Sequence, residues 1–201
     1  MNILEEEEIK TILLGYSPGK ASLINVSLGE KFNENTFTTS STSFVDKYII
    51  IGNKRYKLQL WDTISQEIFH SLTKIFVKDS KIVILVYDIT RRSSFEDIVY
   101  WSNTFHDILK DKPIIGVVGN KKDLFMNEEV SEEEARNFAK EIGALFTLVS
   151  AKEDPHDFNS FLEDLLIEYL NKIGRDVKDR DIKKLKKKKI GENYYNNNFF
   201  S

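Results

Sequence analysis

Four short polar segments, each directly after an apolar stretch, hold residue types that can bind a nucleotide. They are residues 15–22 (GYSPGKAS), 62–66 (DTISQ), 120–123 (NKKD) and 150–152 (SAK). The first joins Gly15 and Gly19 to Lys20, and such a glycine-rich loop can surround phosphates with backbone N–H groups and one positive charge. The third ends in Asp123, whose carboxylate can accept hydrogen bonds from N1 and the exocyclic amine of guanine, a donor pair that adenine lacks. These residue types and their spacing predict a guanine nucleotide site.

The elements that must position these segments alternate between strands and helices. Apolar runs predict strands at 9–14, 44–51, 54–61, 82–87, 114–118 and 145–149. Amphipathic patterns predict helices at 20–28, 93–109, 131–142 and 156–173, the third with Ser131 and Glu134 as a capping box. This alternation indicates an α/β fold, with a six-stranded, mostly parallel sheet that has helices on both faces and one antiparallel strand. The polar segments then lie at carboxyl ends of strands, where open α/β sheets bind ligands.

The set of segments, in this order and spacing, resembles the Ras superfamily of small GTPases over about residues 9 to 173, and within it the Rabs. Residues 57–63 (KLQLWDT) are close to the Rab pattern KLQIWDTAGQE, and residues 86–90 (VYDIT) with Ser94-Phe95 match the strand and helix start that follow. The resemblance implies the P-loop NTPase small-GTPase fold and a switch that binds GTP and GDP, hydrolyses GTP slowly and signals to effectors in vesicle trafficking. It implies Mg²⁺ as cofactor, and effectors, an exchange factor and an activating protein as partners.

The resemblance also implies a role for each matching residue of the nucleotide site. Asn120 would brace the loop, the stem of Lys121 would pack on guanine, and Asp123 would bind its edge. The other nucleotide-binding positions are Gly15, Ser17, Gly19, Lys20, Ala21, Ser22, Phe32, Thr39, Ser65, Ser150, Ala151 and Lys152.

Metal binding, catalysis and effector contact are assigned in the same way. Thr39 and Asp62 would be the metal partners, and Gln66 would be the catalytic residue, which in the family orients the attacking water. The aromatics that Rabs present to effectors match Phe44, Trp61 and Phe76.

The phosphate loop departs from the family pattern G-x-x-x-x-G-K-[ST]. Three residues separate Gly15 from Gly19, and Ala21 follows Lys20 where the magnesium-binding hydroxyl is expected. One register places a deletion in the loop and keeps Lys20 as the phosphate lysine. The ungapped register makes Ser22 the metal ligand but puts Ala21 at the lysine position. We prefer the deletion, and we expect a looser grip on phosphate and a weakly bound Mg²⁺.

Two hypotheses of different classes therefore stand beside each other. Intact Lys20, Thr39, Asp62 and Gln66 favour a slow GTPase. The short loop, Ala21, and Ser65 in place of a family glycine favour a degenerate GTPase domain that acts as a protein-binding module with weak or no turnover.

Charge and composition set the remaining expectations. Residues 1–174, the expected GTPase domain, hold 20 basic and 28 acidic residues, whereas 175–201 hold nine basic and four acidic ones. We expect a cytoplasmic monomer that does not bind nucleic acid, because the body is acidic, and a disordered basic tail. The chain has no cysteine, so we expect no prenyl or palmitoyl anchor. Six lysines between Lys183 and Lys189 could instead make peripheral contact with anionic endomembranes.

Overall fold

A single six-stranded sheet forms the centre of the protein. The computed structural model describes residues 7–15, 19–34, 43–63, 77–106, 112–175 and 177. The strands are β1 (Glu7–Leu14), β2 (Ser43–Ile51), β3 (Lys54–Asp62), β4 (Ile82–Asp88), β5 (Ile114–Asn120) and β6 (Leu145–Leu148). Their spatial order is β2-β3-β1-β4-β5-β6, in which only the β2–β3 pair is antiparallel. The predicted fold class is confirmed.

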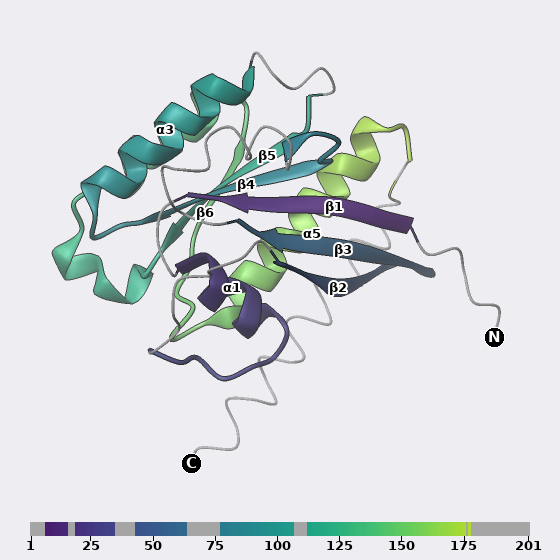
Figure 1. Cartoon of the computed structure of the whole chain (residues 1–201), viewed down its shortest axis with the longest axis horizontal. Helices are drawn as coiled ribbons and strands as arrows, with labels where there is room; N and C mark the ends of the chain where they lie inside the picture. Colours follow the sequence, from purple (N-terminus) through teal and green to yellow (C-terminus); the bar gives the residue numbers. More distant parts are fainter. Residues whose placement is uncertain are drawn as a thin grey trace.

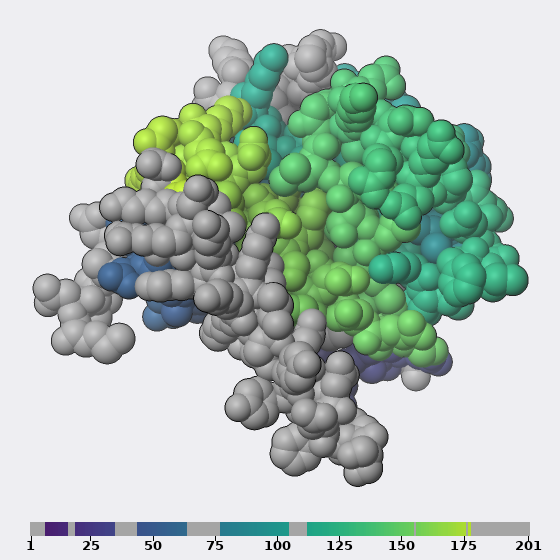
Figure 2. Space-filling model, turned by 180° about the vertical axis from the view of Figure 1, so that it is seen from behind, coloured from purple at the N-terminus to yellow at the C-terminus, as the bar shows by residue number. Residues whose placement is uncertain are grey.

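Helices cover both faces of this sheet (Figure 1). They are α1 (Gly19–Ser27), α3 (Arg92–His106), α4 (Glu132–Glu141) and α5 (Pro155–Lys172), with a 3₁₀ helix η2 (Lys122–Asn127) after β5. α1 and α5 pack on one face, and α3 and α4 pack on the other. From behind, residues from β5 onward, coloured green to yellow, form most of the described surface (Figure 2).

β4 shows why the sequence produces two cores. All seven of its residues are buried, and successive side chains of a strand point to opposite faces. Ile82, Ile84 and Val86 accordingly join the core beneath α1 and α5. Val83, Leu85 and Tyr87 join the core beneath α3 and α4. A continuous apolar run is thus what a strand covered on both faces requires.

The helix starts follow from local capping. Ser131 accepts a hydrogen bond from the Glu134 N–H at 3.2 Å, which accounts for the Ser131 half of the predicted capping box. The Glu134 carboxylate instead bonds Arg92 Nη1 at 2.6 Å and so ties α4 to the start of α3. At α5, Asp154 accepts from the His156 N–H at 2.9 Å, and Pro155 occupies the first turn. Proline fits there because the first N–H groups of a helix have no partner within it.

Candidate functional site

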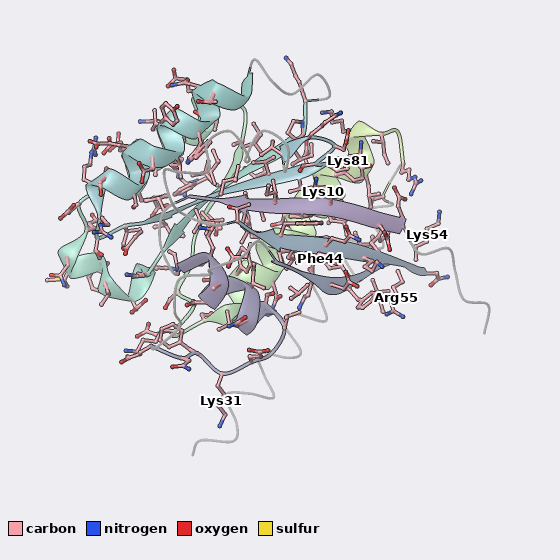
Figure 3. The ribbon with its side chains drawn as sticks, viewed as in Figure 1. Lys10, Lys31, Phe44, Lys54, Arg55 and Lys81 are labelled. Atoms are coloured by element: carbon pink, nitrogen blue, oxygen red, sulfur yellow. The ribbon has the colours of Figure 1, made fainter. Side chains whose placement is uncertain are left out.

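The carboxyl ends of the parallel strands bring the polar segments to one edge of the sheet. Leu13 of β1 lies beside Asp62 of β3, and Asp88 of β4 lies beside Asn120 of β5. α1 starts at this edge, just after Gly15. Lys54 and Arg55 lie at the opposite end, in the β2–β3 hairpin (Figure 3). One edge therefore collects the described residues of all four segments.

Gly15 lets the chain turn closely over β4 after β1 ends. Its φ is +130°, and an added Cβ would lie 2.0 Å from the carbonyl oxygen of Val86. A side chain is therefore excluded by contact with backbone. α1 begins at Gly19 at the same edge, and the N–H groups of a helix N-terminus favour negative charge. Ser17 lies outside the described residues.

Lys20 is the most deeply buried lysine of the described chain, with 1% of its surface exposed. Its ammonium donates a hydrogen bond to the Gly15 carbonyl at 2.6 Å. Burial lowers the pKa of Lys20 from 10.5 to about 8, against the opposing charge of Asp62. The lysine thus lies in the first turn of α1, and its ammonium contacts the last described residue before that helix. That Lys20, not Ala21, is the phosphate lysine stays a prediction.

Asp62 lies close enough to this lysine for its charge to act on it, and Ser22 follows two residues later in α1. Asp62 is 7% exposed at the end of β3, and Thr63 after it donates to the Leu13 carbonyl at 2.8 Å, which pins the segment to β1. Ser22 is also buried. Carboxylate and hydroxyl oxygens fit Mg²⁺, which binds few protein ligands and keeps several waters. The described residues contain no group of three or more His, Asp or Glu that could hold a metal without a nucleotide.

Asn120 connects three of the segments at the end of the site that is predicted to bind guanine. It is 3% exposed, and its Nδ2 donates to the Gly19 carbonyl at 3.4 Å. Its Oδ1 accepts from the Lys121 N–H at 2.7 Å and from the Ala151 N–H at 3.3 Å. One amide side chain therefore holds the phosphate loop, the 120–123 loop and the 150–152 loop together.

Ser150 orients the carboxylate of Asp123. Its hydroxyl donates to Asp123 Oδ1 at 2.6 Å and accepts from the Glu153 N–H at 3.0 Å. The Lys122 N–H also bonds the Val149 carbonyl at 3.0 Å. The two loops are thus joined through backbone and side chain, and the direction of the Asp123 carboxylate is fixed.

Three further side chains surround this end of the site. Phe32 is half-buried against the core of α1 and α5. Lys152 pairs with Glu34 at 2.9 Å, which links the 150–152 loop to the segment after α1. Lys121 adopts φ 67° and pairs through its ammonium with Asp88 Oδ2 at 2.5 Å. The contacts of Glu34 and Asp88 were not among the predicted ones, although Asp88 ends a strand at the ligand edge.

Two of the three predicted effector-facing aromatics form a pair. Phe44 of β2 and Trp61 of β3 stack with ring centroids 4.7 Å apart, and Phe44 is 48% exposed. Lys10 of β1 lies 5.4 Å from the Trp61 ring; Figure 3 labels Phe44 and Lys10. Phe76 lies outside the described residues, as do Thr39, Ser65 and Gln66.

The structure describes little of the segment beyond α5, for which membrane contact was predicted. Of residues 175–201, the structure describes Arg175 and Val177, and Arg175 pairs with Glu7 of β1. The predicted contact of Lys183 to Lys189 lies outside the described residues. No helix in the described part of the chain has the length and apolar character needed to cross a membrane.

Comparison with known proteins shows the same pattern over most of the chain. Residues 10–170 match the Ras family. Ras-related protein Rab-21 of Homo sapiens is 38% identical over 165 residues, which is 82% of this chain and 71% of that protein. Ras-related protein Rab-31 of Rattus norvegicus is 35% identical over 146 residues, 72% of this chain and 75% of its own. Ras-related protein Rab-2B of Dictyostelium discoideum is 36% identical over 148 residues, 73% of each chain.

Proposed function

Because the chain belongs to the Ras family and is similar to Rabs, we propose that it is a Rab-like switch that binds GTP and GDP and acts in vesicle trafficking. The observation that carries this proposal is the guanine end of the site. Asn120 holds three loops together and Ser150 fixes the direction of the Asp123 carboxylate. An acceptor held in this way selects a base that presents two adjacent donors, which is guanine.

The phosphate end supports nucleotide binding through charge and backbone. The Lys20 ammonium exchanges the Gly15 carbonyl for a phosphate oxygen, and the first turn of α1 supplies N–H groups. Asp62 and Thr39 hold Mg²⁺, which when bound neutralises phosphate charge. Ala21 offers no hydroxyl for the metal, so metal binding is weak. Gln66 orients the attacking water. Hydrolysis by the chain alone is slow, because it lacks the arginine that an activating protein supplies.

A second candidate function is a protein-binding module with little or no turnover. Ala21 and the short loop between Gly15 and Gly19 favour it, because both weaken the phosphate and metal contacts that hydrolysis needs. Phe44, which is half-exposed and stacks on Trp61, serves partner binding under either function. Nucleotide-dependent effector binding distinguishes the switch, whereas a module binds its partner whether or not nucleotide is present.

The remaining proposals concern organisation in the cell. Residues 1–174 form the GTPase domain, with an exchange factor, an activating protein and effectors as partners. The basic segment from residue 175 onward contacts anionic endomembranes reversibly, since each lysine or arginine near such a surface contributes about 1 kcal/mol.

The test is a competition titration of the full chain with GDP, ADP and XDP, for wild type and Asp123→Asn. Wild type should prefer GDP. Asp123→Asn should bind GDP about 10- to 100-fold more weakly, as expected for a hydrogen bond to a charged group, and should gain affinity for XDP. Asp79→Asn, the same change at an exposed turn before β4, is the matched control. Equal wild-type affinity for GDP and ADP would refute guanine recognition. Release of phosphate from GTP then separates the switch from the module.

A further inference from the structure

Asp88 is the last residue of β4 and lies beside the start of the 120–123 loop, which follows the adjacent strand β5. It lies in register with Asn120 of β5, and its Oδ2 is 2.5 Å from the ammonium of Lys121. We propose that Asp88 is a positioning residue for guanine binding, which holds Lys121 and the turn at its backbone in the conformation that receives the base. This inference rests on the proposed function and assigns it a residue outside the four polar segments.

The Asp88 carboxylate is itself fixed from the opposite side. Its Oδ1 accepts hydrogen bonds from the Thr90 N–H at 2.9 Å and from the Thr90 hydroxyl at 2.7 Å. Its backbone N–H donates to Ser94 Oγ at 3.0 Å, at the first turn of α3. One oxygen therefore sets the orientation of the carboxylate, and the other is left facing Lys121. With 9% of its side chain exposed, Asp88 is a nearly buried anchor for a lysine that is 41% exposed.

Lys121 needs such an anchor because its backbone is left-handed. Its φ and ψ are 67° and 36°, a conformation that side chains other than glycine disfavour. Among its contacts, the Lys121 N–H bonds Asn120 Oδ1, and the Lys121 ammonium binds Asp88. The first of these contacts belongs to the motif itself, whereas the second comes from a different strand.

The turn at Lys121 determines where Asp123 lies. The Lys121 carbonyl accepts from the Leu124 N–H at 2.8 Å and closes the first turn of η2 around Asp123. The Ser150 hydroxyl then donates a hydrogen bond to the Asp123 carboxylate at 2.6 Å. Loss of the Asp88 contact leaves the ammonium of Lys121 mobile, releases one of several restraints on the turn and broadens the positions of both base-binding residues.

The test uses Asp88→Asn in the full chain, since asparagine keeps the size and an Oδ1 acceptor for Thr90 but removes the charge. The first readout is hydrogen exchange of the ligand-free protein, and exchange across residues 119–125 should quicken about threefold or more while α5 is unchanged. The second is release of a fluorescent GDP analogue, which should be about three- to tenfold faster than in wild type. Asp79→Asn is again the control and should alter neither readout.

A double-mutant cycle separates positioning from a general structural effect. In a Lys121→Met background, Asp88→Asn should add less than twofold to the rate of GDP release. An undiminished effect there would overturn the proposal and would assign Asp88 to the start of α3 alone. Unchanged exchange at 119–125, or slower GDP release in Asp88→Asn, would overturn it as well. Failure of wild type to bind GDP would refute the proposed function, while the exchange readout would still decide whether Asp88 holds the loop.

Discussion

Replacing Lys20 by methionine should stabilise the ligand-free protein while removing nucleotide binding. The charged lysine is 1% exposed, and burial lowers its pKa from 10.5 to about 8 despite the nearby Asp62. A difference of about 2.5 pKa units corresponds to about 3 kcal/mol against the charged form in the folded state. Methionine has a similar length and carries no charge to desolvate. It forfeits the hydrogen bond from the charged ammonium to the Gly15 carbonyl, worth about 1.5–3 kcal/mol, so a net gain of about 1 kcal/mol is expected at pH 7.

The difference in stability between wild type and Lys20→Met should change with pH in a definite direction. Below pH 8 Lys20 is protonated in both states, and the full cost of burying the charge is present. Between pH 8 and 10.5 the unfolded chain binds the proton that the folded protein has released. The free energy of unfolding of wild type therefore rises with pH through this window, relative to Lys20→Met. The advantage of the methionine variant should shrink steadily from pH 7 to pH 10.

Urea unfolding of nucleotide-free protein in EDTA at pH 7, 8, 9 and 10 measures both quantities. Lys31→Met is the matched control, because Lys31 is exposed and points outward from the segment after α1 (Figure 3). It should change stability by less than about 0.5 kcal/mol at every pH. Wild-type and Lys20→Met stabilities that run parallel from pH 7 to 10 would refute the reasoning, as would a methionine variant less stable than wild type at pH 7.

Three other changes test separate parts of the site. Ala21→Ser should slow GDP release and make it more sensitive to EDTA, measured by stopped-flow fluorescence, and an unchanged rate would locate the metal ligand elsewhere. Gly15→Ala should lower stability by several kcal/mol more than Gly29→Ala in thermal unfolding, because both need positive φ but only Gly15 meets backbone, at Val86; equal losses would contradict this. Removal of residues 178–201 should reduce sedimentation with phosphatidylserine vesicles at low salt, and equal pelleting of both proteins would leave that segment without a membrane role.

Strands were easiest to predict from the sequence where burial requires a continuous run of apolar residues. β4 and β5 were evident because their runs are covered on both faces. β1 starts at Glu7, two residues before the predicted start, because Glu7 and Glu8 pair with Tyr56 and Lys57 of β3 despite their charge. η2 was not predicted, since it buries none of its residues and leaves no periodic pattern.

Site residues were predictable where a short motif carries the chemistry. The residues of 120–123 and 150–152 are contiguous and follow apolar strands, so their meeting at one edge could be inferred. The Lys152–Glu34 and Lys121–Asp88 pairs could not, because they join positions far apart through single ion pairs. No local pattern distinguishes these carboxylates from the many others in an acidic chain.

The central place of β1 in the sheet has a consequence for synthesis of the chain. Among the described strands β1 is made first, yet its neighbours in the sheet are β3 and β4, and Thr11 of β1 lies beside Ile82 of β4. Thirty-nine residues separate the end of β1 from the start of β3, and 67 separate it from the start of β4. At translation rates of about 5–20 residues per second these gaps are roughly 2 to 8 s and 3 to 13 s. Until β3 has been made, the apolar side chains of β1 have no neighbouring strand, and until β4 has been made one edge of β1 stays unpaired. The Glu5–Glu8 run at its start repels copies of the nascent strand from one another, and so guards it against pairing between chains on neighbouring ribosomes.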